Sequence, residues 1–234
     1  MKFADGTALT AIKHATDRSG RPLLLSRRGD GLAEALLART GAEAPRVWLS
    51  VDDVPPFPGA PKLGHVRLSG VLRRVPSRAV RSAVLEFAQS NPVPDLFDVG
   101  ADVTLHLLEV QRVSVDKSGV TELIDPVSYA AAEPDPLHEC ERDLLEDLAD
   151  HHGAQIDRLV KRLLKHHDIA CPAPPRAVRL DRYGFVVDLG APAEAPKRDR
   201  WMRLEFMRGV RSQHDLAHLL HPILFHDHGS CCHD

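Results

Sequence analysis

Two hydrophobic patterns meet at residues 133–136, which read EPDP. Before this segment, apolar and polar residues mostly alternate, as in strands that bury one face. After it, apolar residues recur at steps of three and four, as along one side of a helix. Proline has no amide hydrogen and disfavours helix at the residue before it, so the two patterns cannot belong to one element. The sequence therefore predicts two domains, 1–132 and 137–225, and a short tail, 226–234.

The first domain is predicted to consist mainly of strands. Residues 46–54, for example, place Val47, Leu49 and Val51 on one face. Two short helices, at 31–39 and 77–89, interrupt the strands. Strands with two inserted helices predict a small, partly open β-barrel. The expected strands are 7–14, 21–27, 46–54, 65–75, 103–115 and 119–124.

A long helix at 137–165 is predicted to lead the second domain, because its apolar residues form one buried stripe. His152 lies on that stripe and is expected to be a packing histidine with a hydrogen bond, in preference to a ligand. Ser212 is the expected N-cap of a last helix, which Pro222 should end or kink. The elements after the long helix are three strands, at 177–181, 184–189 and 201–206, and a helix at 212–220. The chain is thus predicted to be α+β, a barrel followed by a small α/β domain.

The charge balance limits the kinds of partner. The 234 residues include 30 Lys and Arg against 33 Asp and Glu, a net charge of -3, which argues against nucleic acid or an anionic membrane as a partner. No apolar run approaches the roughly 20 residues of a membrane-spanning helix, and the N-terminus lacks the apolar segment of a secretion signal. The four cysteines show no paired framework. We expect a cytoplasmic protein whose partner is a small-molecule cofactor.

Several motifs resemble those of haem-utilisation (HugZ-like) proteins. These belong to the FMN-binding split-barrel superfamily, which includes pyridoxamine-phosphate oxidases. The segments are EPDPL at 133–137, LADHHG at 148–153, LDRYGF at 180–185 and WMRLEF at 201–206. The resemblance covers most of the chain and implies a split barrel that binds FMN or haem, followed by a small C-terminal domain. It also implies a homodimer, because barrels of this superfamily usually pair across their sheets.

Histidine and cysteine are concentrated at the end of the chain. Six of the 14 histidines fall in the last 21 residues, beside Cys231 and Cys232. They are His214, His218, His221, His226, His228 and His233. Haem-degrading relatives ligate iron through a histidine in a C-terminal loop, so the resemblance implies His226 or His228 as the haem ligand.

Two other interpretations of this tail stay open. His214 and His218 are one helical turn apart, so both imidazoles could face one ion. Together with Cys231, Cys232 and His233 they offer ligands that suit nickel, zinc or copper. The third interpretation is a polar tail that holds no ligand at all.

A flavin phosphate would need hydroxyl and guanidinium donors on the barrel, because these groups suit phosphate oxygens. The candidates are Ser26, Arg27, Arg67 and Ser69, with Arg73 and Arg74 farther along the same strand as Arg67. A charged outer strand face explains the arginines equally well.

Three functions follow from these observations. The leading hypothesis is a haem-binding protein, with haem degradation as its extension. The second is a flavin-dependent oxidoreductase that resembles pyridoxamine-phosphate oxidase. The third is a regulator or binding module without a cofactor. No Ser/His/Asp triad, phosphate-binding loop or carboxylate pair identifies a reaction, so whether the chain is an enzyme stays open.

Overall fold

The computed structural model describes residues 1–39, 44–117, 119–165, 171, 173–191, 196 and 200–225, with no side chains described for 223–225. The chain divides into two compact units. The first joins Met1–Asp53 with Leu63–Glu133, and the second joins Val54–Lys62 with the chain from Pro134 onward. The segment Val54–Lys62, which the sequence pattern places in the first domain, therefore packs with the second unit. The predicted α+β class is confirmed.

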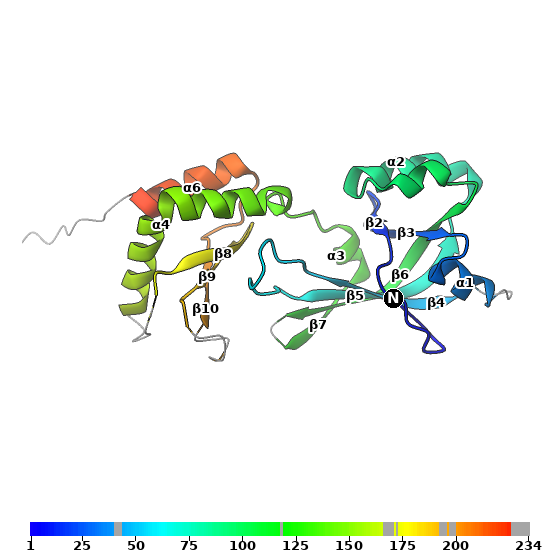
Figure 1. The fold of residues 1–234 in the computed structure, drawn as a ribbon, viewed down its shortest axis with the longest axis horizontal. Helices are drawn as coiled ribbons and strands as arrows, with labels where there is room; N and C mark the ends of the chain where they lie inside the picture. Colours follow the sequence, from blue (N-terminus) through cyan, green and yellow to red (C-terminus); the bar gives the residue numbers. More distant parts are fainter. Residues whose placement is uncertain are drawn as a thin grey trace, which may run out of the picture. The chain divides into compact units, whose positions relative to one another are not determined.

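A seven-stranded antiparallel sheet forms the first unit, in the order β1-β4-β5-β6-β3-β2, with β7 also paired to β6 (Figure 1). Its strands are β1 Lys2–Phe3, β2 His14–Thr16, β3 Pro22–Arg27, β4 Arg46–Asp52, β5 His65–Arg74, β6 Val103–Lys117 and β7 Val120–Ile124. The long strand β6 pairs with β5 on one edge, while β3 and β7 share its other edge. Among the described strands no pairing joins β1 to β2, so closure of the barrel stays a prediction.

A bulge bends this sheet where β5 meets β6. The pairing register shifts between Ser69 and Gly70, which is the local irregularity that an extra residue in one strand produces. A Cβ on Gly70 would lie 2.0 Å from the carbonyl oxygen of Glu109. The close approach of the two backbones therefore requires glycine at this position.

The sheet is covered on both faces, because neighbouring residues of a strand point to opposite sides. Leu24 of β3 belongs to a core with Leu32 of helix α1, Gly31–Leu37. Leu23 and Leu25 belong to a second core with Phe87 of helix α2, Val80–Ser90. The shorter helices of this unit are η1 Ser77–Ala79, η2 Pro94–Asp98 and α3 Pro126–Ala130.

The second unit is built around the long helix α4, Glu141–Lys165, which the turn η3, His138–Cys140, precedes. A three-stranded antiparallel sheet in the order β10-β9-β8 packs against it with helix α6, Gln213–Phe225. The strands are β8 Arg176–Asp181, β9 Gly184–Asp188 and β10 Trp201–Glu205. The predicted apolar stripe of α4 is buried in this core, through Leu145, Leu148, Ile156, Val160 and Leu164.

Two sequence predictions about these elements are wrong. The strand expected at 7–14 is absent except for His14, because the backbone of Thr7 and Leu9 bonds locally to Phe3 and Met1. The last helix, expected to end at 220, continues past Pro222 to Phe225, although proline cannot donate a helical hydrogen bond there; the alternative expectation of a kink at Pro222 stays a prediction. The capping role of Ser212 is confirmed, since its Oγ accepts from the amide of Asp215 at 3.1 Å.

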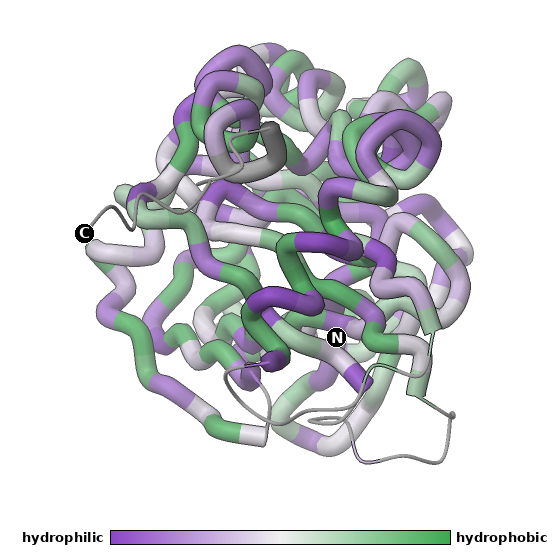
Figure 2. Tube along the Cα trace, turned by 90° about the vertical axis from the view of Figure 1, so that its left-hand side faces the viewer, coloured by the Kyte–Doolittle hydropathy of each residue, from purple (hydrophilic) through white to green (hydrophobic). Residues whose placement is uncertain are grey.

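The helices are amphipathic rather than apolar throughout. Hydrophilic and hydrophobic residues interleave along the chain (Figure 2). Among the residues that the structure describes, no helix has the length and apolar character needed to cross a bilayer.

Candidate functional site

A groove of about 340 Å³ lies between α4 and α6 of the second unit. Its walls are mainly leucine, and its polar groups include one imidazole from each helix. The lining residues are Leu144, Asp147, Leu148, His152, Gln213, Leu216, Ala217, Leu220 and His221. Small-molecule sites are typically concave, mostly apolar and equipped with a few polar groups, and this groove has those properties.

Helical spacing brings these side chains to the groove. Leu144, Leu148 and His152 follow one another at steps of four along α4, so they lie on one side of that helix. Leu216 and Leu220 do the same on α6. Leu148 and Leu216 belong to the buried core of the unit, which anchors the walls of the groove.

His152 lies at the edge of the groove with 27% of its side chain exposed. Its Nε2 is 3.8 Å from Oδ2 of Asp147, one turn earlier on α4. This separation is within ion-pair distance but too long for a hydrogen bond. The half-buried position is compatible with the predicted packing role, which stays a prediction.

His221 faces the same groove from α6. Sequence reasoning counts it among the six C-terminal histidines but assigns it no site. The helical step from Leu216 and Leu220 to His221 was the available signal, because it places the imidazole beside an apolar stripe. What the spacing could not reveal is that α4, far earlier in the chain, supplies the opposite wall.

Five of the predicted ligands lie outside the described residues: His226, His228, Cys231, Cys232 and His233. His226 is the next residue after Phe225, where α6 ends. The helix that leads to the predicted haem ligands is therefore the helix that forms one wall of the groove.

His214 and His218 are brought together on the exposed surface of α6. Their Nε2 atoms are 3.0 Å apart, and their rings meet edge to face with centroids 4.4 Å apart. Among the described residues no group of three or more His, Cys, Asp or Glu side chains is arranged to hold a metal ion. The metal site at the tail stays a prediction.

The four flavin-phosphate candidates do not converge on one site. Ser26 on β3 lies opposite Thr104 of β6, whereas Arg67 on β5 lies opposite Ser114. Along β6 these positions are roughly 30 Å apart at the rise of an extended strand. Ser69 is two residues beyond Arg67 on β5, at the bulge.

Three of these candidates already have partners within the protein. The Oγ of Ser26 is buried and hydrogen-bonds Nε2 of His106 at 2.8 Å. Arg27 donates to Asp95 at 2.8 Å and to Asp98 at 2.5 Å. Arg67 pairs with Asp116 at 3.1 Å. These contacts use part of the donor capacity of the three residues, and the flavin-phosphate site stays a prediction.

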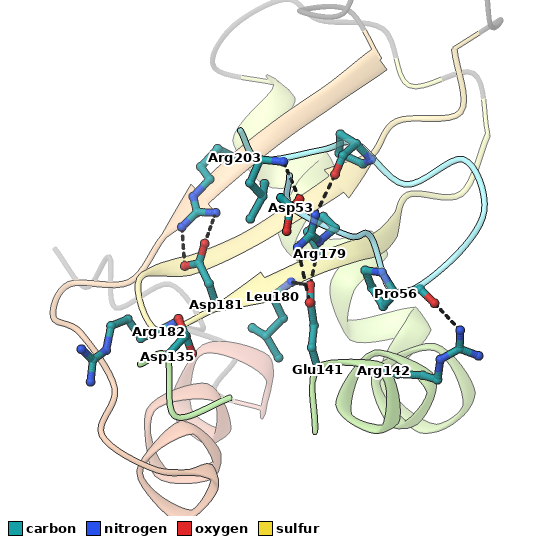
Figure 3. Close-up of polar contacts among 12 residues, drawn as sticks. Asp53, Pro56, Asp135, Glu141, Arg142, Arg179, Leu180, Asp181, Arg182 and Arg203 are labelled. Carbon is teal, nitrogen blue, oxygen red and sulfur yellow. Dashed lines mark hydrogen bonds and ion pairs between the residues drawn. The ribbon is translucent and has the colours of Figure 1, made fainter. Parts of the chain in front are cut away.

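A buried ion pair connects strand β8 to the start of helix α4 in the second unit (Figure 3). Nε of Arg179 on β8 donates to Oε1 of Glu141, at the start of α4, at 2.8 Å, and both side chains are more than nine-tenths buried. The same carboxylate oxygen accepts the amide of Leu180, and Arg179 also donates to the carbonyl of Pro61 at 2.9 Å. Because the pair is enclosed and its hydrogen bonds are made within the unit, its role is structural.

A second charged contact stabilises the turn of the LDRYGF motif. Arg203 on β10 forms two hydrogen bonds to the carboxylate of Asp181, at 2.8 and 2.6 Å. The amide of Arg182 donates to Asp135. At Gly184 a Cβ would meet the carbonyl oxygen of Leu204 at 2.1 Å, so only glycine allows β9 and β10 to approach here. Through the hydrogen bond from Arg182 to Asp135, the LDRYGF motif connects the EPDP segment to the three-stranded sheet.

Comparisons with known proteins show the fold. No family model matches the chain, and no curated protein matches it. A solved structure of a haem-binding protein from Mycobacterium smegmatis is similar, with a TM-score of 0.60 and 17% identity, over 95% of this chain and 88% of that one. A protein of unknown function from Agrobacterium tumefaciens matches with a TM-score of 0.37 and 18% identity, over 93% of this chain and 84% of that one. The chain shares its mixed α/β fold with the mycobacterial protein.

Proposed function

We propose that this protein binds haem, with the porphyrin seated in the groove between α4 and α6. The observation that carries the proposal is a leucine-lined groove with an imidazole on each side, from His152 and His221. Apolar walls suit a porphyrin, and histidine is a common axial ligand of haem iron. The fold shared with a haem-binding protein supports the same conclusion.

The groove has room for part of a porphyrin and opens to solvent. Its volume of about 340 Å³ lies within the range of small-molecule sites. Gln213, Ala217 and His221 on its rim are exposed, so the charged propionate edge of the haem would remain in water. Bound haem supplies the iron chemistry, and the chain supplies an apolar seat and an imidazole.

The imidazole that would hold the haem iron has two candidate sources. His152 and His221 lie in the groove itself. His152 lies on α4, whereas His221 lies on α6. His226 and His228 follow α6 in the sequence and lie outside the described residues.

A hemin titration of the full chain tests the proposal. We expect a saturable Soret band that differs from that of free hemin. Removal of the axial imidazole should weaken hemin affinity by about tenfold or more, since a lost metal ligand costs at least that much. The two informative variants are the double substitution His152→Ala/His221→Ala and deletion of residues 226–234.

The matched control is His138→Ala, because His138 is an exposed histidine of η3, just before α4, and does not line the groove. Loss of binding in the double variant alone places the ligand in the groove, and loss in the deletion alone places it at His226 or His228. Unchanged affinity in both variants, or a full chain without a saturable Soret band, would contradict the proposal. Flavin absorbance in the protein as purified would favour the oxidoreductase instead.

A further inference from the structure

We infer that His214 and His218 on α6 form a binding site for a divalent transition-metal ion, copper(II) or nickel(II), separate from the groove between α4 and α6. The two histidines are one helical turn apart, so their side chains leave the same side of α6. Neither residue lines the groove. Because both are exposed, an ion can reach them directly from water.

The two imidazoles are placed with their Nε2 atoms in contact. These atoms are 3.0 Å apart, and the rings meet edge to face. A contact this short requires one nitrogen to donate and the other to accept, so at least one Nε2 presents a lone pair. A metal ion would take the place of the hydrogen that the two nitrogens share, and both lone pairs would then point to the ion.

The separation of the two nitrogens matches that of neighbouring ligands on one ion. With metal–nitrogen bonds of about 2.0–2.1 Å, two nitrogens 3.0 Å apart subtend an angle of about 95° at the metal. Neighbouring ligands make an angle of about 90° in square-planar and tetragonal coordination, the geometries typical of copper(II) and nickel(II). Zinc prefers the wider tetrahedral angle. The geometry therefore favours copper(II) or nickel(II) over zinc.

The imidazoles have each other as partners, and the nearby acid is engaged elsewhere. Within the described part of the chain, neither His214 nor His218 has a carboxylate oxygen within 4.0 Å. Asp215, which follows His214 on the helix, accepts two hydrogen bonds from the guanidinium of Arg208, at 2.7 and 2.5 Å. The site therefore supplies two nitrogen ligands, and water completes the coordination of an ion at this exposed position.

Calorimetric titration of the full chain with Ni²⁺ tests the inference. Because the histidines and cysteines of residues 226–234 could bind the same ion, the titration is repeated after deletion of that segment. The deletion variant should retain a saturable Ni²⁺ site, and Zn²⁺ should bind there more weakly. In the deletion variant, His214→Ala and His218→Ala should each weaken Ni²⁺ affinity by about tenfold or more, because each removes one of the two ligands. Alanine is the best helix former, so α6 should stay intact.

The matched control is His138→Ala, which removes an exposed histidine of η3. Weaker Ni²⁺ binding in both α6 variants, with unchanged affinity in His138→Ala, supports the site. The inference is overturned by undiminished affinity in either α6 variant, by equal weakening in the control, by tighter binding of Zn²⁺ than of Ni²⁺, or by no saturable Ni²⁺ binding after the deletion. Hemin affinity of the double variant His214→Ala/His218→Ala should stay at the wild-type value, which separates this test from the haem proposal.

Discussion

Among single residues, His106 shows how the fold changes side-chain chemistry. Burial and the nearby Arg74 lower the pKa of this histidine from 6.5 to about 4, while Asp30 acts weakly in the opposite direction. Below pH 6.5 the unfolded chain therefore binds a proton that the folded protein does not. The contribution of His106 to the free energy of unfolding is fully present above pH 6.5. It is lost as the pH drops towards 4, and the loss amounts to about 3 kcal/mol.

The change His106→Gln tests this expectation, because glutamine can still hydrogen-bond Ser26 but does not titrate. Urea unfolding at several pH values should show that the variant loses less stability than the wild type between pH 6.5 and 4. An identical decline in the two proteins would mean that other groups cause the pH dependence.

Residue roles on β3 could not be predicted from the sequence. The sequence offers Ser26 as a phosphate donor because its type and its strand are suitable. Five consecutive residues of this strand, from Pro22 to Ser26, are buried, since α1 and α2 cover both faces of the sheet. When both faces of a strand are buried, the alternation of apolar and polar residues does not show which side chains are exposed. In addition, His106, the hydrogen-bond partner of Ser26, lies 80 residues later in the sequence.

At the scale of elements, the pair Glu141–Arg179 joins α4 to β8, and its loss should be costly. Changing Glu141→Gln or Arg179→Met alone leaves a buried charge without its partner, which typically costs about 3–5 kcal/mol. Urea unfolding measures the loss. The exposed pair Lys161–Asp157, also on α4, provides the control, because Lys161→Met should cost less than about 1 kcal/mol. Equal losses of stability at the two pairs would show that the buried ion pair contributes no more to the fold than the exposed one.

Most elements could be predicted because their periodicity is strong. The expected strand at 65–75 corresponds to β5, His65–Arg74, and the helix at 137–165 to η3 and α4. The failures have local causes. The segment at 7–14 alternates like a strand but bonds to the N-terminal residues, and α6 tolerates Pro222 inside the helix. Neither contact is visible in a hydrophobic pattern.

For the whole molecule, the change of periodicity at residues 133–136 indicated two parts, and the structure divides between Glu133 and Pro134. The sequence could not place Val54–Lys62 with the second unit, because that assignment depends on contacts such as the one between Pro61 and Arg179. The groove likewise needs two helices that are far apart in the chain.

The homodimer stays a prediction, which light scattering of the purified protein would check.

The haem proposal depends on the groove being the seat of the porphyrin, so filling the groove tests it most directly. Ala217 lines the groove and is exposed, so Ala217→Trp should occupy the space without disturbing the core. Ala154→Trp, on the exposed surface of α4 outside the groove, is the matched control. Hemin affinity, measured from the Soret band, should fall by about tenfold or more in Ala217→Trp, as expected when a ligand loses its pocket, and should be unchanged in Ala154→Trp. Wild-type affinity in Ala217→Trp would contradict the account.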